Sequence, residues 1–315
     1  MIRVSELSKY YGEAQALKGC SFQVPKGEIV GLVGKNGAGK TTALRILSGQ
    51  MLPSAGEVEV DGHALSAGGH AIRARIGYLP ETPPLYPEMS VAAYLGFACR
   101  LKRIERAQVA TRVSKVIRST GLEGMAERRL GTLARGYRQR VGIAQAIVHD
   151  PPVVLLDEPM SGLDPLQIVQ IRDLILSLKP RHTVLFSSHI LSEVTQICDR
   201  VILLDDGTVK AQGTEANLRR ELLQRRTLSL AVRGDADKLR QALGAIEGIA
   251  VEVRPSVGAP EGVVEARIVT EDDVRERVSR LCVEAGLGLL ELREERHGLE
   301  ELMLQLLEGG EDGRS

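Results

Sequence analysis

The stretch GLVGKNGAGKTTALRILSG, residues 31–49, joins an apolar run to a segment with helical periodicity. Its centre fits the pattern GxxxxGK[ST], in which glycines allow backbone N–H groups to converge on phosphate oxygens. In that pattern the lysine adds charge toward the β- and γ-phosphates, the threonine hydroxyl can bind Mg²⁺, and the following helix directs its positive end at the anion. A glycine-rich turn without a ligand is the alternative, but the loop has the strand-before, helix-after context that phosphate binding requires. We therefore predict nucleotide contacts from Gly34, Lys35, Asn36, Gly37, Ala38, Gly39, Lys40, Thr41 and Thr42.

Two acidic residues follow a second apolar run, in VVLLDEP at residues 153–159. Parallel core strands deliver the residues at their carboxyl ends to the edge of the sheet where ligands bind. Asp157 is predicted to hold Mg²⁺, directly or through water, beside the Thr41 hydroxyl. Glu158 is predicted to orient and polarise the attacking water as a general base. The alternative, an acidic turn at a strand end, is disfavoured because the chain also carries a phosphate loop.

His189 ends another apolar strand, in FSSHIL at residues 186–191. A single histidine is usually a surface or core residue. At the predicted ligand edge of the sheet, however, its ring could hydrogen-bond a γ-phosphate or the attacking water. Position alone leaves both interpretations open.

The composition of the 315-residue chain limits its partners. Lysine plus arginine and aspartate plus glutamate number 41 each, so there is no global basic field to favour nucleic acid, although a local patch stays possible. Tryptophan is absent and aromatic residues make up 3%, which argues against stacking platforms for single strands. No segment approaches 18 uninterrupted apolar residues, so another chain must supply any membrane spans. The four cysteines, at 20, 99, 198 and 282, lie far apart and are interpreted as reduced.

The pattern along the chain predicts a parallel α/β core. Short Val, Ile and Leu runs recur at 28–34, 152–158, 182–188 and 200–207, without the alternation of half-exposed strands. Helical patterns at 40–51 and 166–178 follow the first two runs, as in strand–loop–helix repeats. Residues 1–24 indicate two antiparallel strands and a turn. Residues 84–150 change to a charged helical pattern and are predicted to form an insertion into the core.

A second unit is predicted from residue 225 to residue 309. Strand patterns at 227–234, 251–256, 262–270 and 287–295 surround amphipathic helical patterns at 235–248 and 271–286. This βαββαβ order is that of a small ferredoxin-like α+β domain. A last helix is expected at 298–309, before an acidic tail, 310–315, that is expected to be disordered.

Five motifs occur in the order and spacing found in ABC-type ATPases. They are residues 34–42, YLPE at 78–81, LARGYRQR at 133–140, LLDEPMSGLD at 155–164 and SSHIL at 187–191. On these residues, 1–220 resembles an ABC-type nucleotide-binding domain, which implies a P-loop NTPase fold with an antiparallel β subdomain and a helical insertion. The sequences YLPE and GYRQR are most similar to the corresponding motifs in ATPase subunits of multidrug- and gliding-motility-type exporters. Those subunits carry a small C-terminal domain.

The resemblance assigns further roles. Tyr11 matches the aromatic residue that stacks on adenine, with Tyr10 as the neighbouring alternative. Glu81 stands where the family usually has a glutamine that senses Mg²⁺ and contacts the membrane partner. Residues 133–137 match the LSGGQ signature, which closes over ATP bound to the opposite subunit, and 161–164 match the loop that joins the two sites. The contacts implied in this way are Ala134, Arg135, Gly136, Tyr137 and Asp164, and His189 corresponds to the switch histidine.

Three residues depart from the family pattern. Ala134 replaces the usual signature serine, Arg135 replaces the glycine after it, and Glu81 replaces the glutamine. Glutamate can still bind Mg²⁺ or water through oxygen. Arg135 could place positive charge near the γ-phosphate, and a helix N-terminus at Gly136 would help as well. Because the phosphate-loop and acidic residues are intact, we expect an active ATPase.

The resemblance implies an ATP- and Mg²⁺-dependent subunit of a membrane exporter. Two copies of the chain would pair with each other and act with transmembrane permease subunits at the cytoplasmic face of the membrane. Two alternatives stay open. A soluble ATPase acting on ribosomes or DNA would usually carry two nucleotide domains or long coiled coils, which this chain lacks. A degenerate subunit that binds ATP as a regulatory clamp is favoured by Ala134 alone.

Overall fold

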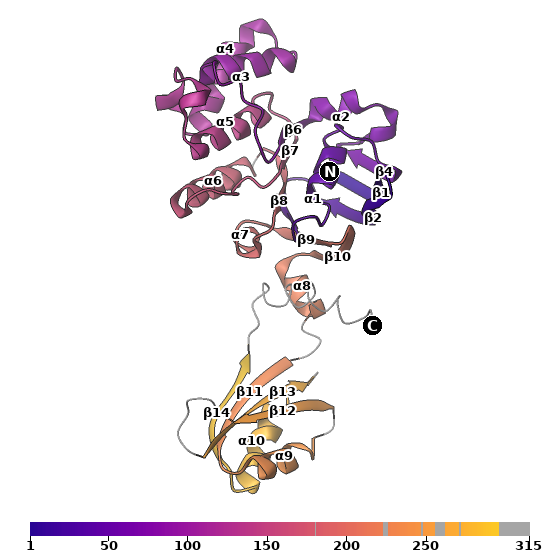
Figure 1. Ribbon diagram of the computed structural model, residues 1–315, viewed down its shortest axis with the longest axis vertical. Helices are drawn as coiled ribbons and strands as arrows, with labels where there is room; N and C mark the ends of the chain where they lie inside the picture. The colour runs from indigo at the N-terminus through magenta and orange to yellow at the C-terminus, as the bar shows by residue number, and fades with distance from the viewer. Residues whose placement is uncertain (180, 223–225, 247, 256–261, 271, 296–315) are drawn as a thin grey trace. The chain divides into compact units, whose positions relative to one another are not determined.

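The computed structural model describes residues 1–315 except 180, 223–225, 247, 256–261, 271 and 296–315 (Figure 1). Contacts divide the chain into two units, Met1–Glu215 and Ala216–Ser315. The division lies at the start of α8 (Glu215–Leu222), a few residues before the boundary of 220–225 expected from the sequence. The helix expected at 298–309 and the tail at 310–315 lie outside the described residues.

A six-stranded sheet in the described residues of the first unit has the order β10-β9-β3-β8-β7-β6. All of its neighbouring pairs are parallel except β9 and β10. Every residue of β3, β7 and β8 is buried, as continuous apolar runs predict. The strands are β3 (Ile29–Val33), β6 (Ile76–Leu79), β7 (Val153–Leu156), β8 (Thr183–Ser188), β9 (Arg200–Asp205) and β10 (Thr208–Gly213).

Parallel pairing brings the carboxyl ends of three strands to one edge. Val33 at the end of β3 lies opposite Ser188 on β8, and Leu156 at the end of β7 lies opposite Phe186 on β8. The residues that follow these strands are the phosphate loop, Asp157 with Glu158, and His189. The register therefore places the three predicted catalytic segments side by side.

A second sheet, in the order β2-β1-β4-β5, carries the predicted N-terminal strand pair. β1 (Ile2–Tyr11) and β2 (Ala14–Val24) are antiparallel, as the sequence indicated. Side chains of this sheet and of α1 (Lys40–Leu47) form one buried cluster with central-strand residues such as Leu32 and Leu155. Residues 55–79, for which the sequence pattern predicts no helix or strand, form β4 (Ala55–Val60), β5 (His63–Ala64), η1 (Leu65–Ala67), α2 (Gly69–Arg75) and the four-residue strand β6.

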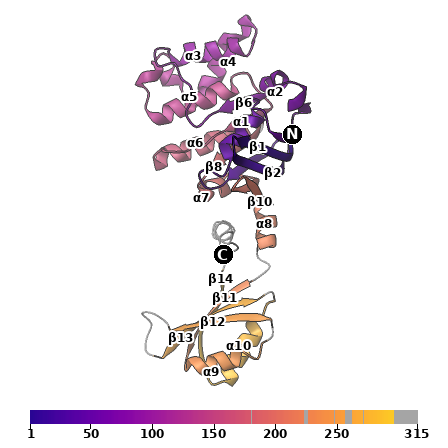
Figure 2. The same ribbon diagram turned by 45° about the vertical axis from the view of Figure 1, so that its right-hand side comes forward.

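The predicted helical insertion contains three α-helices and two short 3₁₀ turns in the described residues. Figures 1 and 2 show α3, α4 and α5 grouped together beyond the β6–β7 edge of the central sheet. α5 also contacts β6 and β7, so the insertion is anchored to the core through this helix. The bounds are α3 (Val91–Leu101), α4 (Arg106–Ser119), η2 (Glu123–Met125), η3 (Leu130–Thr132) and α5 (Arg135–Ile147). Two further helices, α6 (Pro165–Leu178) and α7 (Leu191–Thr195), contact β8, and α7 also contacts β3.

The second unit has the predicted βαββαβ order and an antiparallel sheet in the order β12-β13-β11-β14. The helices α9 and α10 pack on the sheet around a separate buried cluster that includes Leu230, Ile268 and Cys282. The elements are β11 (Arg226–Arg233), α9 (Ala236–Leu243), β12 (Ile249–Pro255), β13 (Val263–Thr270), α10 (Arg275–Glu284) and β14 (Gly288–Glu295). This sheet order is that of a ferredoxin-like sandwich.

In the described ranges, we find no helix that is both long enough and apolar enough to cross a membrane. The four cysteines, all described, are free thiols.

Candidate nucleotide site

The loop between β3 and α1 has the backbone that its glycines predict. Gly39 caps α1 with a φ of 103°, and Gly37 has a φ of 85°, both in the left-handed region that favours glycine. A Cβ atom at Gly34 would lie 2.1 Å from the carbonyl oxygen of Leu204. The loop therefore needs its glycines for close packing as well as for its turns.

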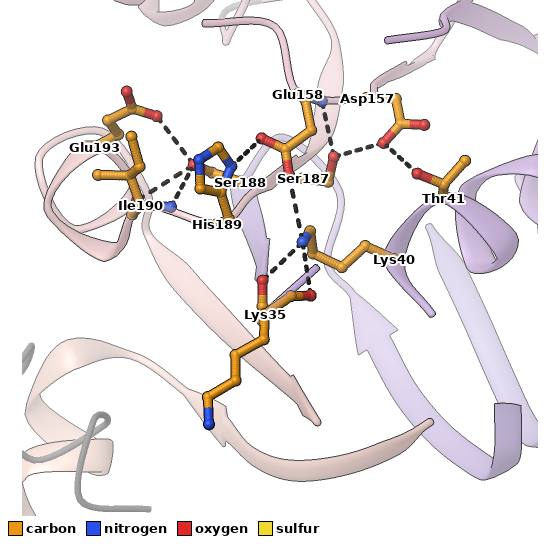
Figure 3. A network of polar contacts seen from close by, with 11 residues as sticks. Lys35, Lys40, Thr41, Asp157, Glu158, Ser187, Ser188, His189, Ile190 and Glu193 are labelled. Atoms are coloured by element: carbon orange, nitrogen blue, oxygen red, sulfur yellow. Dashed lines mark hydrogen bonds and ion pairs between the residues drawn. The ribbon is translucent and has the colours of Figure 1, made fainter. Parts of the chain in front are cut away.

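Lys40 is the first residue of α1, directly after the loop, and is nearly fully buried, with 6% of the residue exposed. Its Nζ donates hydrogen bonds to the carbonyl oxygens of Gly34, at 2.7 Å, and Lys35, at 3.2 Å. The same atom lies 3.3 Å from Oε1 of Glu158 (Figure 3). A cation is thus held where a phosphate chain wrapped by this loop would lie.

Asp157 is buried directly after β7, with 1% exposed. Its Oδ1 accepts hydrogen bonds from the hydroxyls of Ser187, at 2.7 Å, and Thr41, at 3.2 Å. Its Oδ2 is buried and has no hydrogen-bond partner in the described part of the chain. Burial raises the pKa of this carboxyl above its ordinary value, against the opposing effect of the two hydroxyl bonds.

Glu158 has a positive φ of 47°, which is strained for a residue with a side chain. Its amide donates to Ser187 Oγ at 2.8 Å, and this bond helps to hold the strained backbone. Its Oε2 lies 2.9 Å from Nδ1 of His189, so the ring donates from Nδ1 in this arrangement (Figure 3). Both carboxylate oxygens are therefore engaged, one by Lys40 and one by His189.

Lys40, Glu158 and His189 line a cavity of about 390 Å³. Its size and its mixture of backbone amides, hydroxyls and charged groups suit a phosphate chain. Glu81, which is exposed, also reaches its rim. The lining residues are Ala16, Asn36, Gly37, Gly39, Lys40, Thr41, Thr42, Glu81, Glu158, Ser161 and His189.

Tyr11, Asp164 and residues 133–137 do not line this cavity. Tyr11 is 45% exposed at the end of β1, where its hydroxyl lies 3.1 Å from Met51 Sδ and Lys9 lies over its ring. Asp164 caps α6 by accepting from the amide of Gln167. No residue of 133–137, all of which are described, lines the phosphate-loop cavity of its own chain. Arg135 instead lines a different cavity, of about 460 Å³, which Glu81 also borders.

Sequence reasoning missed Ser187, whose hydroxyl joins the two acidic residues. The SSHIL motif contained this residue, but a serine at the end of an apolar strand carries no spacing signal of its own. Ala16 and Ser161 were also missed as lining residues.

Comparisons with known proteins fit this geometry. The family described as ABC transporter matches residues 17–161. ABC transporter ATP-binding protein YxlF of Bacillus subtilis (strain 168) is 35% identical over 221 residues, which are 70% of this chain and 73% of that protein. The chain belongs to the ATP-binding subunits of ABC transporters. As a member of this ATPase family, it binds ATP as part of a transporter.

Two further ABC proteins are informative. Bacitracin transport ATP-binding protein BcrA of Bacillus licheniformis is 30% identical over 315 residues, covering 99% of both chains. The likeness to this ABC protein therefore extends through the second unit. A solved structure of the ATP-binding cassette MJ0796, described as a dimeric post-hydrolysis state bound to ADP and Pi, has a TM-score of 0.62 at 26% identity. It covers 68% of this chain and 98% of that one.

Proposed function

We propose that this chain hydrolyses ATP as the paired, membrane-peripheral subunit of an exporter and powers transport by partner transmembrane subunits. The observation that supports the proposal is that Glu158 contacts both Lys40 and His189, and that all three residues line one cavity of a size that suits a phosphate chain. The buried acid Asp157, next to Glu158 in the sequence, accepts a hydrogen bond from the Thr41 hydroxyl. These groups are what phosphoryl transfer needs for positioning and charge stabilisation.

The donor set at Asp157 fits a magnesium ion. Its buried Oδ2 lacks a partner among the described residues, and Thr41 Oγ1 lies 3.2 Å from Oδ1. Magnesium prefers oxygen ligands and usually keeps several waters and phosphates, so two protein ligands suffice. Asp157 and Thr41 would hold the ion, with Glu81 at the cavity rim as a further oxygen ligand. When bound, Mg²⁺ neutralises charge on the phosphates.

Glu158 is the proposed general base. Its two carboxylate oxygens contact Lys40 and His189. A phosphate chain in the loop would compete for the Lys40 ammonium, because the phosphate chain carries more negative charge than one carboxylate. Released from Lys40, Glu158 can accept a proton from the attacking water while His189 contacts the γ-phosphate.

The remaining predicted residues support a paired site. The signature segment at 133–137 lines none of its own chain's phosphate-loop cavity, which fits its proposed contact with ATP on a second copy. MJ0796 was solved as a dimer, and this chain is similar to it over nearly the whole of that protein. Tyr11 would stack on adenine, and Asp164 would join the two sites. ATP would close the pair and hydrolysis would open it.

The exporter assignment rests on the full-length likeness to a bacitracin transport protein. We infer that two copies act with two permease subunits at the cytoplasmic face of the membrane and that nucleic acid is not a partner. Turnover should be measured with and without the membrane protein that co-purifies with the chain. Stimulation by that protein supports the assignment, and ATP binding without turnover in either case would make the chain a regulatory clamp.

Glu158→Gln tests the chemistry. The variant should still bind ATP, lose turnover by about a hundredfold or more, and form an ATP-trapped dimer on size-exclusion chromatography. Glu59→Gln, at a β4 position whose side chain is 47% exposed, is the matched control and should behave as the native chain. Near-normal turnover in Glu158→Gln would show that another group is the base.

A further inference from the structure

The turn that carries His189 is held by a relay of hydrogen bonds in the described structure. His189 and Ile190 connect the end of β8 to the five-residue helix α7, and Ile190 is the N-cap residue. Isoleucine has no side-chain acceptor, so the helix lacks an ordinary cap. The amide of Ile190 instead donates to Ser188 Oγ at 3.0 Å.

Glu193 completes this relay from the third position of α7. The Ser188 hydroxyl donates to Glu193 Oε2 at 2.9 Å, shorter than its 3.3 Å contact with the Ile190 carbonyl oxygen. In a capping box, a glutamate at this position reaches back to the N-cap amide itself. Here the buried Ser188 hydroxyl stands between the two, so the carboxylate and the amide are joined through one oxygen (Figure 3).

We propose that Glu193, acting through Ser188, is a positioning residue that fixes the turn at 188–190 so that His189 Nδ1 meets Glu158. The inference rests on the proposed catalytic role of His189. Ser188 and His189 are adjacent, so the bonds that fix the backbone at 188 and 190 leave little freedom for the residue between them. Glu193 is half-buried, and the charges of both His189 and Glu158 influence its pKa, which burial raises. The carboxylate is therefore close enough to affect the catalytic pair directly.

The test compares Glu193→Ala, Glu193→Gln and Ser188→Ala in the full-length chain. Glu193→Ala and Ser188→Ala each break the relay and should lower kcat about tenfold, with KM for ATP changed less than twofold, because misplacement of a catalytic group costs turnover. Glu193→Gln keeps an acceptor oxygen for Ser188 and should recover to within about threefold of the native kcat. Ser192→Ala, on the same helix, is the matched control and should leave kcat unchanged.

Two results separate positioning from general stabilisation. In a His189→Ala background, Glu193→Ala should change kcat less than twofold, because the residue being positioned is gone. A full tenfold loss in that background would overturn the proposal.

Imidazole ¹⁵N shifts of His189 give a readout that needs no turnover. Glu193→Ala should move them and Ser192→Ala should not, so unchanged shifts would also overturn it. A native chain without turnover would contradict the proposed function instead, and the ¹⁵N shifts would still decide this inference.

Discussion

The hydroxyl of Ser187 donates to Oδ1 of Asp157 at 2.7 Å and at the same time accepts the amide N–H of Glu158 at 2.8 Å. One buried oxygen thus orients the proposed metal ligand and holds the strained backbone of the proposed base. The two roles cannot be separated, since both bonds use the same atom. Ser187 is fully buried near the end of β8, so bulk water does not reach this hydroxyl.

Ser187→Ala should therefore affect stability and metal use together. The loss leaves the Glu158 amide without its acceptor, which costs about 1–3 kcal/mol and lowers the Tm of the first unit by about 3–10 °C. With Asp157 less well oriented, the Mg²⁺ concentration for half-maximal turnover should rise about tenfold. Calorimetry and magnesium titrations of ATPase rate measure the two effects. Ser177→Ala, where the hydroxyl bonds within helix α6, is the control, and a variant matching it in both assays would contradict the role of Ser187.

The sequence predicts which residues reach the site, but it does not predict which of them contact one another. Lys40, Glu158 and His189 meet because each follows an apolar run, and parallel strands bring their carboxyl ends to one edge. An apolar run and the residue that follows it form a local pattern, so these positions could be predicted from the sequence alone. The pairing of Lys40 with Glu158 was not predicted, because residues 118 positions apart become neighbours only through the strand order. Strand β6 was missed for a similar reason: four residues are too few to show a period, and its pairing with β7 stabilises it.

His149, just after α5, predicts a pH effect on stability. Its Nε2 lies 3.1 Å from the Ile76 carbonyl oxygen, and its Nδ1 is buried without a partner in the described residues. Burial, together with the nearby Lys102 ammonium, lowers its pKa from 6.5 to about 4. Between about pH 6.5 and pH 4 the unfolded chain therefore binds more protons than the folded chain. The free energy of unfolding should fall through this window as pH falls, by about 3 kcal/mol from this residue.

His149→Gln should remove that part of the pH dependence, because an amide can still donate to Ile76 but does not titrate. Denaturant titrations of the first unit at pH 7 and pH 4.5 give the comparison. His70→Gln, at an exposed position of α2, is the control and should keep the native pH dependence. Equal loss of stability on acidification in the native chain and in His149→Gln would contradict the assignment.

The separate cores of the two units predict that the first folds by itself. Buried residues of the second unit, such as Leu230 and Ile268, cluster among themselves. A chain shortened to end near residue 225 should therefore bind ATP with near-native affinity. We expect weaker ATP-driven dimerisation or altered regulation rather than a loss of chemistry. Fluorescent-nucleotide binding and size-exclusion chromatography measure both properties, and a soluble shortened chain that no longer binds ATP would contradict the prediction.

Ala134 and Arg135 give a prediction about the signature segment. Ala134 is the exposed N-cap of α5 and provides no side-chain acceptor to it. The guanidinium of Arg135 lies next to Gly162 of its own chain, since a Cβ atom at Gly162 would lie 2.5 Å from Arg135 Nη1. In the proposed pair, alanine lacks the hydroxyl that the family's serine gives to the γ-phosphate. One such charge-assisted bond is worth about 1.5–3 kcal/mol, which corresponds to one to two powers of ten in rate.

Ala134→Ser should cap α5, which raises stability by about 1 kcal/mol, and its effect on turnover shows whether the missing hydroxyl is compensated. If the guanidinium of Arg135 does not compensate, Ala134→Ser should raise turnover and ATP-driven dimerisation by at least about tenfold. If it does compensate, Ala134→Ser should be nearly silent in turnover, and Arg135→Gly should lower turnover instead. ATPase kinetics on both single variants, with the membrane subunits present, distinguish the two cases. Native rate and ATP affinity in both variants would show that the segment does not contact phosphate, because neither the hydroxyl nor the guanidinium would then affect the nucleotide of a second copy.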